Sequence, residues 1–204
     1  MRRHDLPCPN ARLLEQSGED AGALEAWQQW FAPAELDVAA AFAREQRRMQ
    51  WLLSRTAAKQ LAVERGLCEE ASRCRVDRTR IRTADGAELA FSSLSHSGLW
   101  AAAAIDEEPV GIDVQVVRNL SERAAHLFLT DAEETSMRSC GIPNRLLHFW
   151  CAKEAAWKAR AGETATLRSV PLELRSEGPR GLRFDTAETW AEGELVLAIT
   201  RPSL

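Results

Sequence analysis

A tract without glycine or proline, residues 144–161, most constrains how this chain can fold. Alanine, lysine, glutamate, arginine and tryptophan dominate it, and all are compatible with a helix of about four or five turns. Gly162 then supplies a stop. At 100° per residue, Trp150, Glu154 and Lys158 fall on one stripe of this helix. The tract therefore predicts a helix that places a carboxylate one turn from an ammonium.

Two further tracts decide how that pair is interpreted. Alone, the pair is explained by an ordinary i,i+4 ion pair that stabilises the helix by roughly 0.2 to 0.5 kcal/mol. Residues 110–114, VGIDV, predict a buried strand with one charge, Asp113. A buried carboxylate costs several kcal/mol unless it is paired or bound to a metal, so Asp113 needs a partner. Residues 94–98, LSHSG, place His96 between two serines at the end of a strand.

The three tracts, in the order SHSG, GID and WCAKEAAWK, resemble the signature of the 4'-phosphopantetheinyl transferases. The resemblance covers residues 46–162 and indicates the larger, monomeric, surfactin-synthetase-activating type, which modifies carrier proteins of polyketide, peptide and fatty-acid synthesis. It implies an α+β fold of two similar halves, each a small antiparallel sheet with packed helices, in a pseudo-twofold arrangement. The halves correspond to residues 1–109 and 110–204. No linker rich in Gly, Ser or Pro divides them, so we expect one continuous unit.

The resemblance also implies a reaction. Such an enzyme transfers the phosphopantetheine arm of coenzyme A to a serine of an apo carrier protein and releases adenosine 3',5'-bisphosphate. Asp113 and Glu154 match the family's magnesium ligands, and carboxylate oxygens suit that ion. Glu154 also matches the general base, acting through a metal-bound water. Lys158, assisted by Lys153, matches the cation that faces the developing phosphate charge.

Further contacts with coenzyme A are implied in the first half of the chain. WLLSRTAAKQL resembles a family segment that binds the 3'-phosphate, which makes Arg55 the first candidate and Lys59 and Arg48 its neighbours. His96, with Ser95 beside it, would donate a hydrogen bond to a phosphate. A purely structural histidine remains the alternative for His96.

Two departures from the family pattern keep a second function open. The turn Gly86-Ala87-Glu88 stands where many relatives carry Gly-Lys-Pro, and Gln115 stands where a glutamate often provides a third metal ligand. A glutamine carbonyl or a water can fill that place, so we expect weaker or altered metal binding. The alternative is a non-catalytic module that binds coenzyme A or a carrier protein. The retained carboxylates and Lys158 argue against it.

Composition narrows the class of protein. Apolar residues make up 45% and charged residues 27%, as in soluble globular proteins. No apolar window approaches 18 residues and the first residues lack a signal-peptide core, so we expect a cytoplasmic protein that binds no membrane. Five cysteines without a CxxC are expected to be reduced thiols. Residues 44–82 carry 11 basic and 5 acidic residues, which favours a local anionic ligand over nucleic acid, although a solvated helix face explains the same charge.

The remaining tracts predict a mixture of helices and strands. Residues 1–20 are expected to form an irregular arm, and residues 21–31 a short helix. The longest helical tract, residues 34–66, forms one helix or two. Further expected elements are an edge hairpin at 74–82, strands at 91–105, 110–117, 170–175, 182–184 and 195–200, and a helix at 130–139 capped by Thr130. The apolar residues Leu120, Leu127, Phe128 and Leu129 either form a docking surface for an acidic carrier helix or pack in the core.

Overall fold

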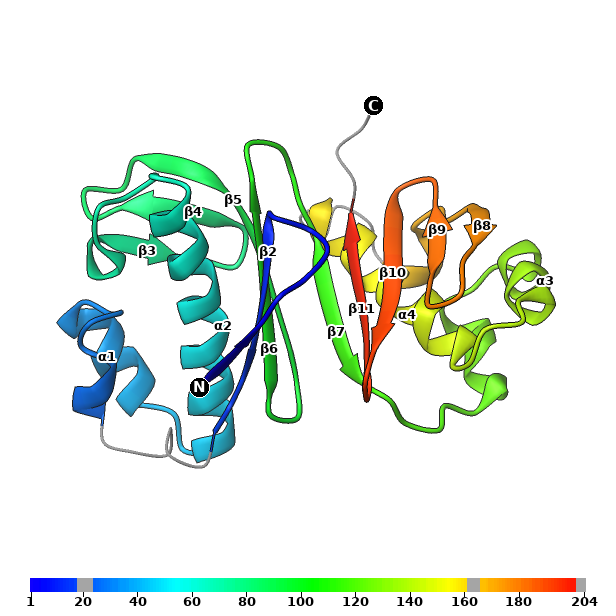
Figure 1. Ribbon diagram of the computed structural model, residues 1–204, viewed down its shortest axis with the longest axis horizontal. Coiled ribbons are helices and arrows are strands. Elements are labelled where there is room, and N and C mark those ends of the chain that lie inside the picture. Colours follow the sequence, from blue (N-terminus) through cyan, green and yellow to red (C-terminus); the bar gives the residue numbers. More distant parts are fainter. Residues whose placement is uncertain (18–23, 161–165, 201–204) are drawn as a thin grey trace. The chain divides into compact units, whose positions relative to one another are not determined.

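A computed structural model describes residues 1–17, 24–160 and 166–200 (Figure 1). The chain divides into two compact units, Met1–Glu108 and Pro109–Leu204, each with its own antiparallel sheet and its own helices. No helix in these three ranges is long and apolar enough to cross a membrane. All five cysteines carry free thiols.

The first unit contains a six-stranded sheet in the order β1-β2-β6-β5-β4-β3. Its strands are β1 (Arg2–His4), β2 (Ala11–Glu15), β3 (Cys74–Val76), β4 (Arg80–Thr83), β5 (Glu88–Ser97) and β6 (Trp100–Asp106). Its helices are α1 (Pro33–Ala40) and α2 (Glu45–Glu64), with short 3-10 turns at Leu24–Trp27 and Ala71–Arg73. Four consecutive buried alanines make β6 thin enough for a helix to pack closely on the sheet.

The helix α2 buries one face in the core of the first unit. Met49, Leu52, Leu53, Ala57 and Leu61 recur at helical spacing and are all buried. They share a hydrophobic cluster with alanines of β6 and with residues of β3 and β4. Burial of this stripe, rather than the intrinsic propensity of the segment, therefore holds α2 against the sheet.

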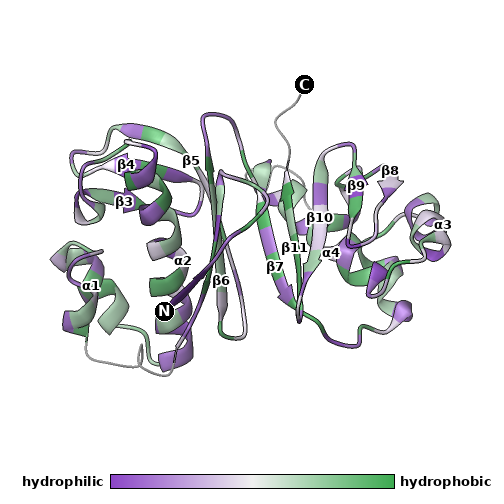
Figure 2. Cartoon of the chain, viewed as in Figure 1, coloured by the Kyte–Doolittle hydropathy of each residue, from purple (hydrophilic) through white to green (hydrophobic). Residues whose placement is uncertain are grey.

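The second unit contains a five-stranded sheet in the order β7-β11-β10-β9-β8. Its strands are β7 (Ile112–Val116), β8 (Leu174–Glu177), β9 (Leu182–Phe184), β10 (Ala187–Glu192) and β11 (Leu195–Thr200). Its helices are α3 (Asp131–Ser139) and α4 (Arg145–Ala159), with 3-10 turns at Glu122–Leu127 and Leu167–Ser169. Every residue of β11 is buried. Figure 2 shows both hydrophobic and hydrophilic colouring on β7, whose sequence is IDVQV.

The two units repeat one plan. When β1 is left out, the first sheet runs β2-β6-β5-β4-β3, which corresponds strand by strand to β7-β11-β10-β9-β8. In both units the first of these strands is followed by two helices and then by four more strands. The predicted α+β class with two similar halves is confirmed. The pseudo-twofold arrangement stays a prediction.

Several local predictions are confirmed. The helix α4 covers most of residues 144–161, while the expected stop at Gly162 lies outside the described residues. Thr130 caps α3, with its hydroxyl accepting from the Glu133 amide at 3.3 Å. The SHSG tract ends β5, where Gly98 adopts a positive φ of 59°.

Other local predictions were wrong or incomplete. The expected arm contains β1 and β2, and β2 is buried because it pairs with both β1 and β6. For residues 34–66, where one helix or two was expected, the structure has two, α1 and α2. The strand β10 was missed because its sequence, AETWAE, contains no apolar run. The helix expected at 21–31 falls partly outside the described residues and is otherwise a 3-10 turn at Leu24–Trp27.

Candidate active site

The candidate site is built where α4 lies against β7. A Cβ atom added to Gly111, just before β7, would lie 1.8 Å from the carbonyl oxygen of Ala155 in α4. Only glycine leaves room for this contact between backbones. Thr200 of β11 fixes the same glycine, because its hydroxyl accepts from the Gly111 amide at 2.8 Å and its own amide donates to the Gly111 carbonyl at 2.9 Å. The contact brings the charged face of α4 to β7.

Asp113 is the buried charge of β7, with only 2% of its surface exposed. The Lys158 Nζ atom donates to Asp113 Oδ1 at 2.7 Å and to the Ile112 carbonyl at 3.0 Å. Gln115, two residues along and therefore on the same face of the strand, donates from Nε2 to Asp113 Oδ2 at 3.1 Å. The partner that the buried Asp113 carboxylate requires is thus Lys158, the last residue of the WCAKEAAWK tract.

Glu154 lies one turn before Lys158 on α4 and is partly buried. Among the described residues it has no hydrogen-bond or ion-pair partner. Burial raises the pKa of the Glu154 carboxyl above its usual value; Lys158 opposes this shift and the charge of Asp113 adds to it. A carboxylate with a raised pKa accepts a proton more readily, so Glu154 has the properties of a general base.

The ligand set suits a hard divalent cation. Asp113 and Glu154 supply two carboxylates and Gln115 supplies an amide oxygen, whereas Lys158 supplies one compensating positive charge. Magnesium is commonly bound through one or two carboxylates while it keeps several waters. Within residues 1–17, 24–160 and 166–200, no cluster of three or more His, Cys, Asp or Glu side chains could hold a metal. Two carboxylates and an amide oxygen are donors that fit an ion which keeps several of its waters, as magnesium does.

Lys153 does not belong to this cluster, which corrects the prediction that it helps to bind phosphate. Its side chain is fully buried and its Nζ donates to Glu133 Oε1 at 2.7 Å and to the Val170 carbonyl. Burial lowers the pKa of Lys153, while the Glu133 carboxylate opposes that shift. Lys153 therefore connects α4 to α3 and to the segment before β8.

Lys59 of the first unit is corrected for the same reason. Its Nζ is fully buried and donates to Glu35 Oε2 at 2.7 Å, to the Ala71 carbonyl at 3.1 Å and to the Cys74 carbonyl at 2.6 Å. These acceptors use all three protons of the ammonium. Lys59 thus has a structural role and no donor left for a phosphate.

Arg55 has the properties of an anion ligand. Its guanidinium stacks over the Trp51 ring at 4.1 Å, and it makes no hydrogen bond or ion pair with any residue in the described ranges. Burial lowers the pKa of Arg55 to about 10, an effect that Glu35 and Asp77 oppose, and the group remains charged at neutral pH. Arg48, about two helical turns before it, lies on the surface of α2, 4.0 Å from Glu45.

Ser95 and His96 are successive residues of β5 in the first unit. Ser95 is buried and pairs with Ala102, whereas His96 is half-buried and pairs with Ala101. Successive strand residues face opposite sides of a sheet, so the two side chains do not act on one ligand in the same way. The predicted residues therefore form two groups, with Arg48, Arg55, Ser95 and His96 in the first unit and Asp113, Gln115, Glu154 and Lys158 in the second.

Comparison with known proteins finds relatives for the second unit. Residues 109–200 match the model of the 4'-phosphopantetheinyl transferase superfamily. The chain is similar to "4'-phosphopantetheinyl transferase psf-1" of Bacillus pumilus, with 31% identity over 100 residues, 47% of this chain and 43% of that protein. It is also similar to "4'-phosphopantetheinyl transferase Sfp" of Bacillus subtilis (strain 168), with 28% identity over 93 residues, 44% of this chain and 42% of that protein.

The predicted resemblance to phosphopantetheinyl transferases is thereby confirmed, and Asp113, Gln115, Glu154 and Lys158 all lie in the matching segment. The match spans less than half the length of each of these relatives. In this segment, sequence reasoning found the charged residues and the GID motif but gave Gly111 no role of its own. A glycine immediately before a buried strand was the available signal for its contact with α4.

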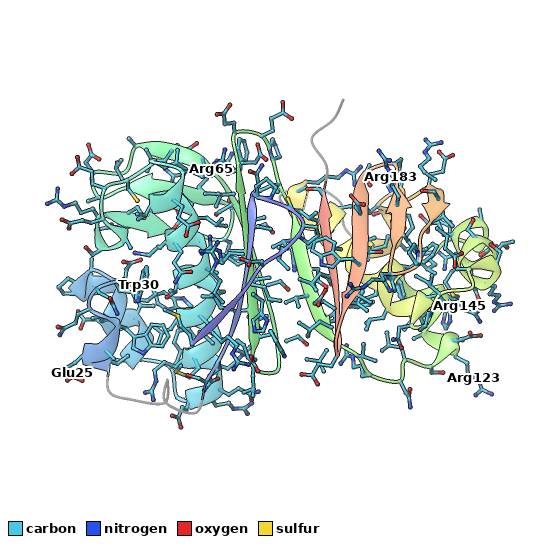
Figure 3. The ribbon with its side chains drawn as sticks, in the orientation of Figure 1. Glu25, Trp30, Arg65, Arg123, Arg145 and Arg183 are labelled. Carbon is cyan, nitrogen blue, oxygen red and sulfur yellow. The ribbon has the colours of Figure 1, made fainter. Side chains whose placement is uncertain are left out.

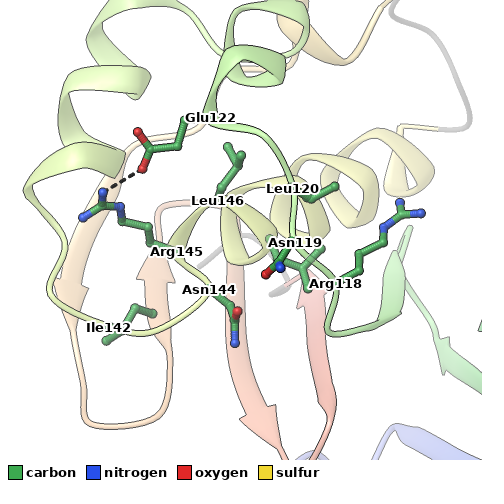
Figure 4. A pocket seen from close by; sticks show the side chains of 9 residues that line it. Arg118, Asn119, Leu120, Glu122, Ile142, Asn144, Arg145 and Leu146 are labelled. Atoms are coloured by element: carbon green, nitrogen blue, oxygen red, sulfur yellow. Dashed lines mark hydrogen bonds and ion pairs between the residues drawn. The ribbon is translucent and has the colours of Figure 1, made fainter.

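A cavity of about 260 Å³ lies elsewhere in the superfamily segment, at the start of α4 (Figure 4). Its lining includes Leu120, Asn144 and Arg145, and the Arg145 guanidinium donates to Glu122 at 2.8 Å. None of the three charged residues of the candidate site lines it. Figure 3 shows Arg123 and Arg183, both exposed, projecting from the outside of the same unit.

The four apolar residues considered for carrier docking differ in their burial. Phe128 and Leu129 are buried in the core of the second unit, so they are core residues. Leu127 is 69% exposed, and Leu120 is partly buried at the cavity. Only the last two remain candidates for contact with a partner.

Proposed function

We propose that the chain is an enzyme that transfers the 4'-phosphopantetheine arm of coenzyme A to a serine of an apo carrier protein and releases adenosine 3',5'-bisphosphate. The observation that carries the proposal is the contact between buried Asp113 and Lys158, with unpartnered Glu154 beside them, inside the superfamily segment. A binding module has no need for a desolvated carboxylate of raised pKa next to an ion pair.

The proton of the carrier serine goes to Glu154 in this proposal. The serine oxygen forms a bond to the β-phosphorus, which carries the pantetheine arm, and the bond from that phosphorus to the bridging oxygen of the pyrophosphate breaks. The electron pair of the broken bond leaves on adenosine 3',5'-bisphosphate. Burial makes Glu154 a stronger base than an exposed glutamate, whether it takes the proton directly or through one water.

Lys158 and Asp113 set the charge of the site. Lys158 has 22% of its side chain exposed, so its ammonium can face a phosphate while it remains bound to Asp113. There it stabilises negative charge on the pyrophosphate and on the leaving group. Asp113, Glu154 and the amide of Gln115 would hold magnesium, which neutralises and orients the pyrophosphate when bound.

Residues of the first unit would anchor coenzyme A. Arg55 is a charged, partly desolvated guanidinium that lacks an acidic contact partner among the described residues, and such a group favours a phosphate. We propose it as the ligand of the 3'-phosphate, with Arg48 as a more exposed neighbour. His96 and Ser95 are proposed contacts of the pyrophosphate region.

The carrier and the setting are part of the same proposal. The carrier is of the acyl, peptidyl or polyketide type. Leu120 offers apolar surface at the cavity near the start of α4, and exposed Leu127 offers more at the end of the 3-10 turn Glu122–Leu127. We propose that the protein acts in the cytoplasm as a monomer.

The direct test incubates the protein with coenzyme A, magnesium and an apo carrier protein, and detects a phosphopantetheine adduct on the carrier serine by mass spectrometry. We expect the adduct with the wild-type protein and not with Asp113→Ala or Glu154→Ala. The matched control is Glu134→Ala, which removes a surface acid paired with Arg138 on α3 and should leave the transfer rate unchanged. Full activity in either site variant would reject the role assigned to that residue.

Gln115 favours the alternative of a non-catalytic module for coenzyme A or a carrier protein, because the site lacks a third carboxylate. The structure gives its amide a contact with Asp113. We expect Gln115→Glu to lower the magnesium concentration needed for half-maximal transfer, since it adds a negative charge next to Asp113. An unchanged magnesium titration would remove Gln115 from the metal site. A wild-type protein that binds coenzyme A but transfers nothing would support the binding module.

A further inference from the structure

Gln115 and Asp113 form a contact within the strand β7. The two residues are two apart, so their side chains lie on the same face of the strand. In the sheet register, Asp113 is beside Ala198 and Gln115 is beside Val196 of β11. Both of these β11 residues pack in one cluster with Ala155 of α4. The contact between Gln115 and Asp113 therefore lies on the face of the sheet that α4 covers.

The chemistry of the contact decides which end of the amide faces Asp113. The Gln115 Nε2 atom is 3.1 Å from Asp113 Oδ2. An ionised carboxylate only accepts hydrogen bonds, so its partner is the NH₂ group and not the amide oxygen. A carboxylate at position 115 would bring a second negative charge to the same oxygen, and the two would stay ionised together only with a cation between them. Gln115 thus holds Asp113 with no ion present.

Asp113 is held at both of its carboxylate oxygens. Lys158 of α4 donates to Oδ1 at 2.7 Å, while Gln115 donates to Oδ2. With a donor at one oxygen alone, the carboxylate can still turn about its Cβ–Cγ bond, a torsion with a broad preference. Donors from two different elements at the two oxygens fix the plane of the group. Each oxygen can accept two contacts, so neither donor excludes an ion from the carboxylate.

Gln115 is the donor that serves Asp113 alone. Lys158 also donates to the Ile112 carbonyl at 3.0 Å, and in the proposed function it faces a phosphate as well. The side chain of Gln115 makes no second hydrogen bond with any residue of the described ranges. Asp113 is 2% exposed, so water has little access to its carboxylate and does not readily replace a lost donor.

We propose that Gln115 is a positioning residue whose side-chain N–H holds the Asp113 carboxylate in the orientation that binds a divalent cation, both before and after the cation arrives. The amide oxygen remains available to the ion or to one of its waters. The inference rests on the proposed function through the cation alone, and it does not depend on which carrier protein is modified.

The first test observes the amide itself in the wild-type protein. The side-chain NH₂ signals of Gln115 are assigned by nuclear magnetic resonance, and their exchange with water is measured without metal and with saturating magnesium, which is diamagnetic. We expect exchange slower by roughly tenfold than that of the exposed Gln29, and equally slow with magnesium bound.

The second test measures cation binding without turnover. Binding of Mn²⁺, a probe for magnesium sites, is titrated by electron paramagnetic resonance with no coenzyme A and no carrier present. Gln115→Met keeps the length of the side chain but has no donor, and we expect binding weaker by roughly tenfold. Gln115→Glu adds a charge, so it should bind Mn²⁺ more tightly but have a lower thermal unfolding midpoint without metal, because two carboxylates then meet.

Gln60→Met is the matched control. It makes the same substitution beside a buried charge of the first unit, where Gln60 accepts from Arg12 at 3.1 Å, and it should leave Mn²⁺ binding unchanged. The thermal unfolding midpoint of each variant is recorded without metal and with saturating Mn²⁺. Should Gln115→Met fail to fold, the exchange measurement on the wild-type protein and the midpoint of Gln115→Glu still test the inference.

The possible results are distinct from those that bear on the transfer reaction. Exchange as fast as that of Gln29, or protection that is lost when magnesium binds, would overturn the inference. So would wild-type Mn²⁺ binding in Gln115→Met, a wild-type midpoint in metal-free Gln115→Glu, or a wild-type protein that binds no Mn²⁺. Failure of the proposed function is read separately, as an absent phosphopantetheine adduct on the carrier.

Discussion

The site around Asp113 has a counterpart in the first unit with its charges reversed. Arg12 of β2 is only 4% exposed, its Nη1 donates to Gln60 Oε1 at 3.1 Å, and its Nη2 contacts Glu64. Arg12 lies opposite Ala103 of β6 just as Asp113 lies opposite Ala198 of β11. Each unit thus places one buried charged side chain on the strand β2 or β7. Side chains from the last turns of the long helix, α2 or α4, compensate that charge.

The surroundings of Arg12 and of Asp113 differ in the charge that is left uncompensated. In the first unit, the Glu64 carboxylate is contacted by both Arg12 and Arg3, so no negative charge is left uncompensated there. In the second unit, Asp113 and Glu154 face the single ammonium of Lys158, which leaves one negative charge uncompensated. That remaining negative charge is what the proposed magnesium ion would compensate. One framework supports both arrangements, and the chemistry depends on which charges the framework carries.

Both units also contain a buried ion pair between their short and long helices. Glu35, in the first turn of α1, accepts from the Ala32 amide at 3.1 Å and binds Lys59 of α2. Glu133, in the first turn of α3, accepts from the Thr130 amide at 2.8 Å and binds Lys153 of α4. Both lysines are fully buried. The short helix of each unit is thereby connected to the long one, and this contact serves stability.

The largest expected effect tests that equivalence. Lys153→Met and Lys59→Met each leave a carboxylate with little exposure and no cation, which typically costs about 3 to 5 kcal/mol. We expect a loss of this size in the free energy of unfolding for both variants, measured by urea denaturation. The loss should be the greater for Lys153, because Glu133 is more buried than Glu35, with side chains 8% and 13% exposed.

A double variant serves as the control for this prediction. Lys153→Met combined with Glu133→Gln removes the uncompensated charge, so it should recover part of the lost stability. A loss below about 1 kcal/mol in Lys153→Met would contradict the view that the buried ion pair connects the helices.

The second prediction concerns the approach of helix to strand. Gly111 has no room for a Cβ, whereas its counterpart Asn10 carries a side chain that donates to Asp106 at 2.6 Å. The two positions correspond because the backbone carbonyl of each accepts a hydrogen bond from an amide of the neighbouring strand. The donor is Ile105 in the first unit and Thr200 in the second. The helix of the second unit thus approaches its sheet more closely at this point.

Gly111→Ala should therefore displace α4 and separate Glu154 and Lys158 from Asp113. We expect it to lower the free energy of unfolding by about 3 kcal/mol, the upper end for overpacking, because the contact is with backbone. Asn10→Ala should cost about 1 kcal/mol, the value of one hydrogen bond. Two results together would contradict the closer approach of helix to sheet in the second unit. These are equal stability losses for Gly111→Ala and Asn10→Ala in urea denaturation, and unchanged Mn²⁺ binding by Gly111→Ala.

The third prediction is a difference in pH dependence. His148 of α4 is 1% exposed, with its Nδ1 2.8 Å from the Thr189 hydroxyl oxygen, and burial lowers its pKa to about 4. The unfolded chain binds a proton near pH 6.5, so the folded state binds fewer protons and loses stability as the pH falls from 6.5 toward 4. We expect a loss of about 2 to 3 kcal/mol between pH 7 and 4.5 from this group.

The first unit provides a control for this third prediction. The position in α2 that matches His148 of α4 is Ser54, whose side chain does not titrate. His148→Asn should remove most of the acid-dependent loss, measured as the difference in urea stability between pH 7 and 4.5. Ser54→Ala should leave that difference as it is in the wild-type protein. A variant at position 148 that keeps the full acid loss would show that other groups cause it.

The sequence predicted those features that depend on local pattern. The stripe of α4, the cap on α3 and the buried strand around Asp113 follow from helical spacing, a threonine before acidic residues and an apolar run. The motifs then related Asp113 to Glu154 and to Lys158, the latter 45 residues away, which spacing alone does not do. The first strands were missed because a three-residue and a five-residue strand separated by prolines carry too short a pattern.

The roles of the two buried lysines could not be predicted for a different reason. Helical spacing says which face of α2 or α4 a lysine occupies, but not that a carboxylate 20 or 24 residues earlier meets it. Burial of an ammonium is expected only once that partner is known. The same limit applies to Gly111, whose function depends on contact with Ala155 of α4, more than 40 residues later in the chain.

The rate of phosphopantetheine transfer in a matched pair of variants tests the central claim most directly. Glu154→Gln and Glu64→Gln make the same substitution in the long helices of the two units, each next to the buried ion of its sheet. The account predicts that Glu154→Gln slows transfer to the carrier serine by at least about 100-fold, and that Glu64→Gln stays within a few-fold of wild type. Equal rates for the two variants, or a greater loss in Glu64→Gln, would contradict it.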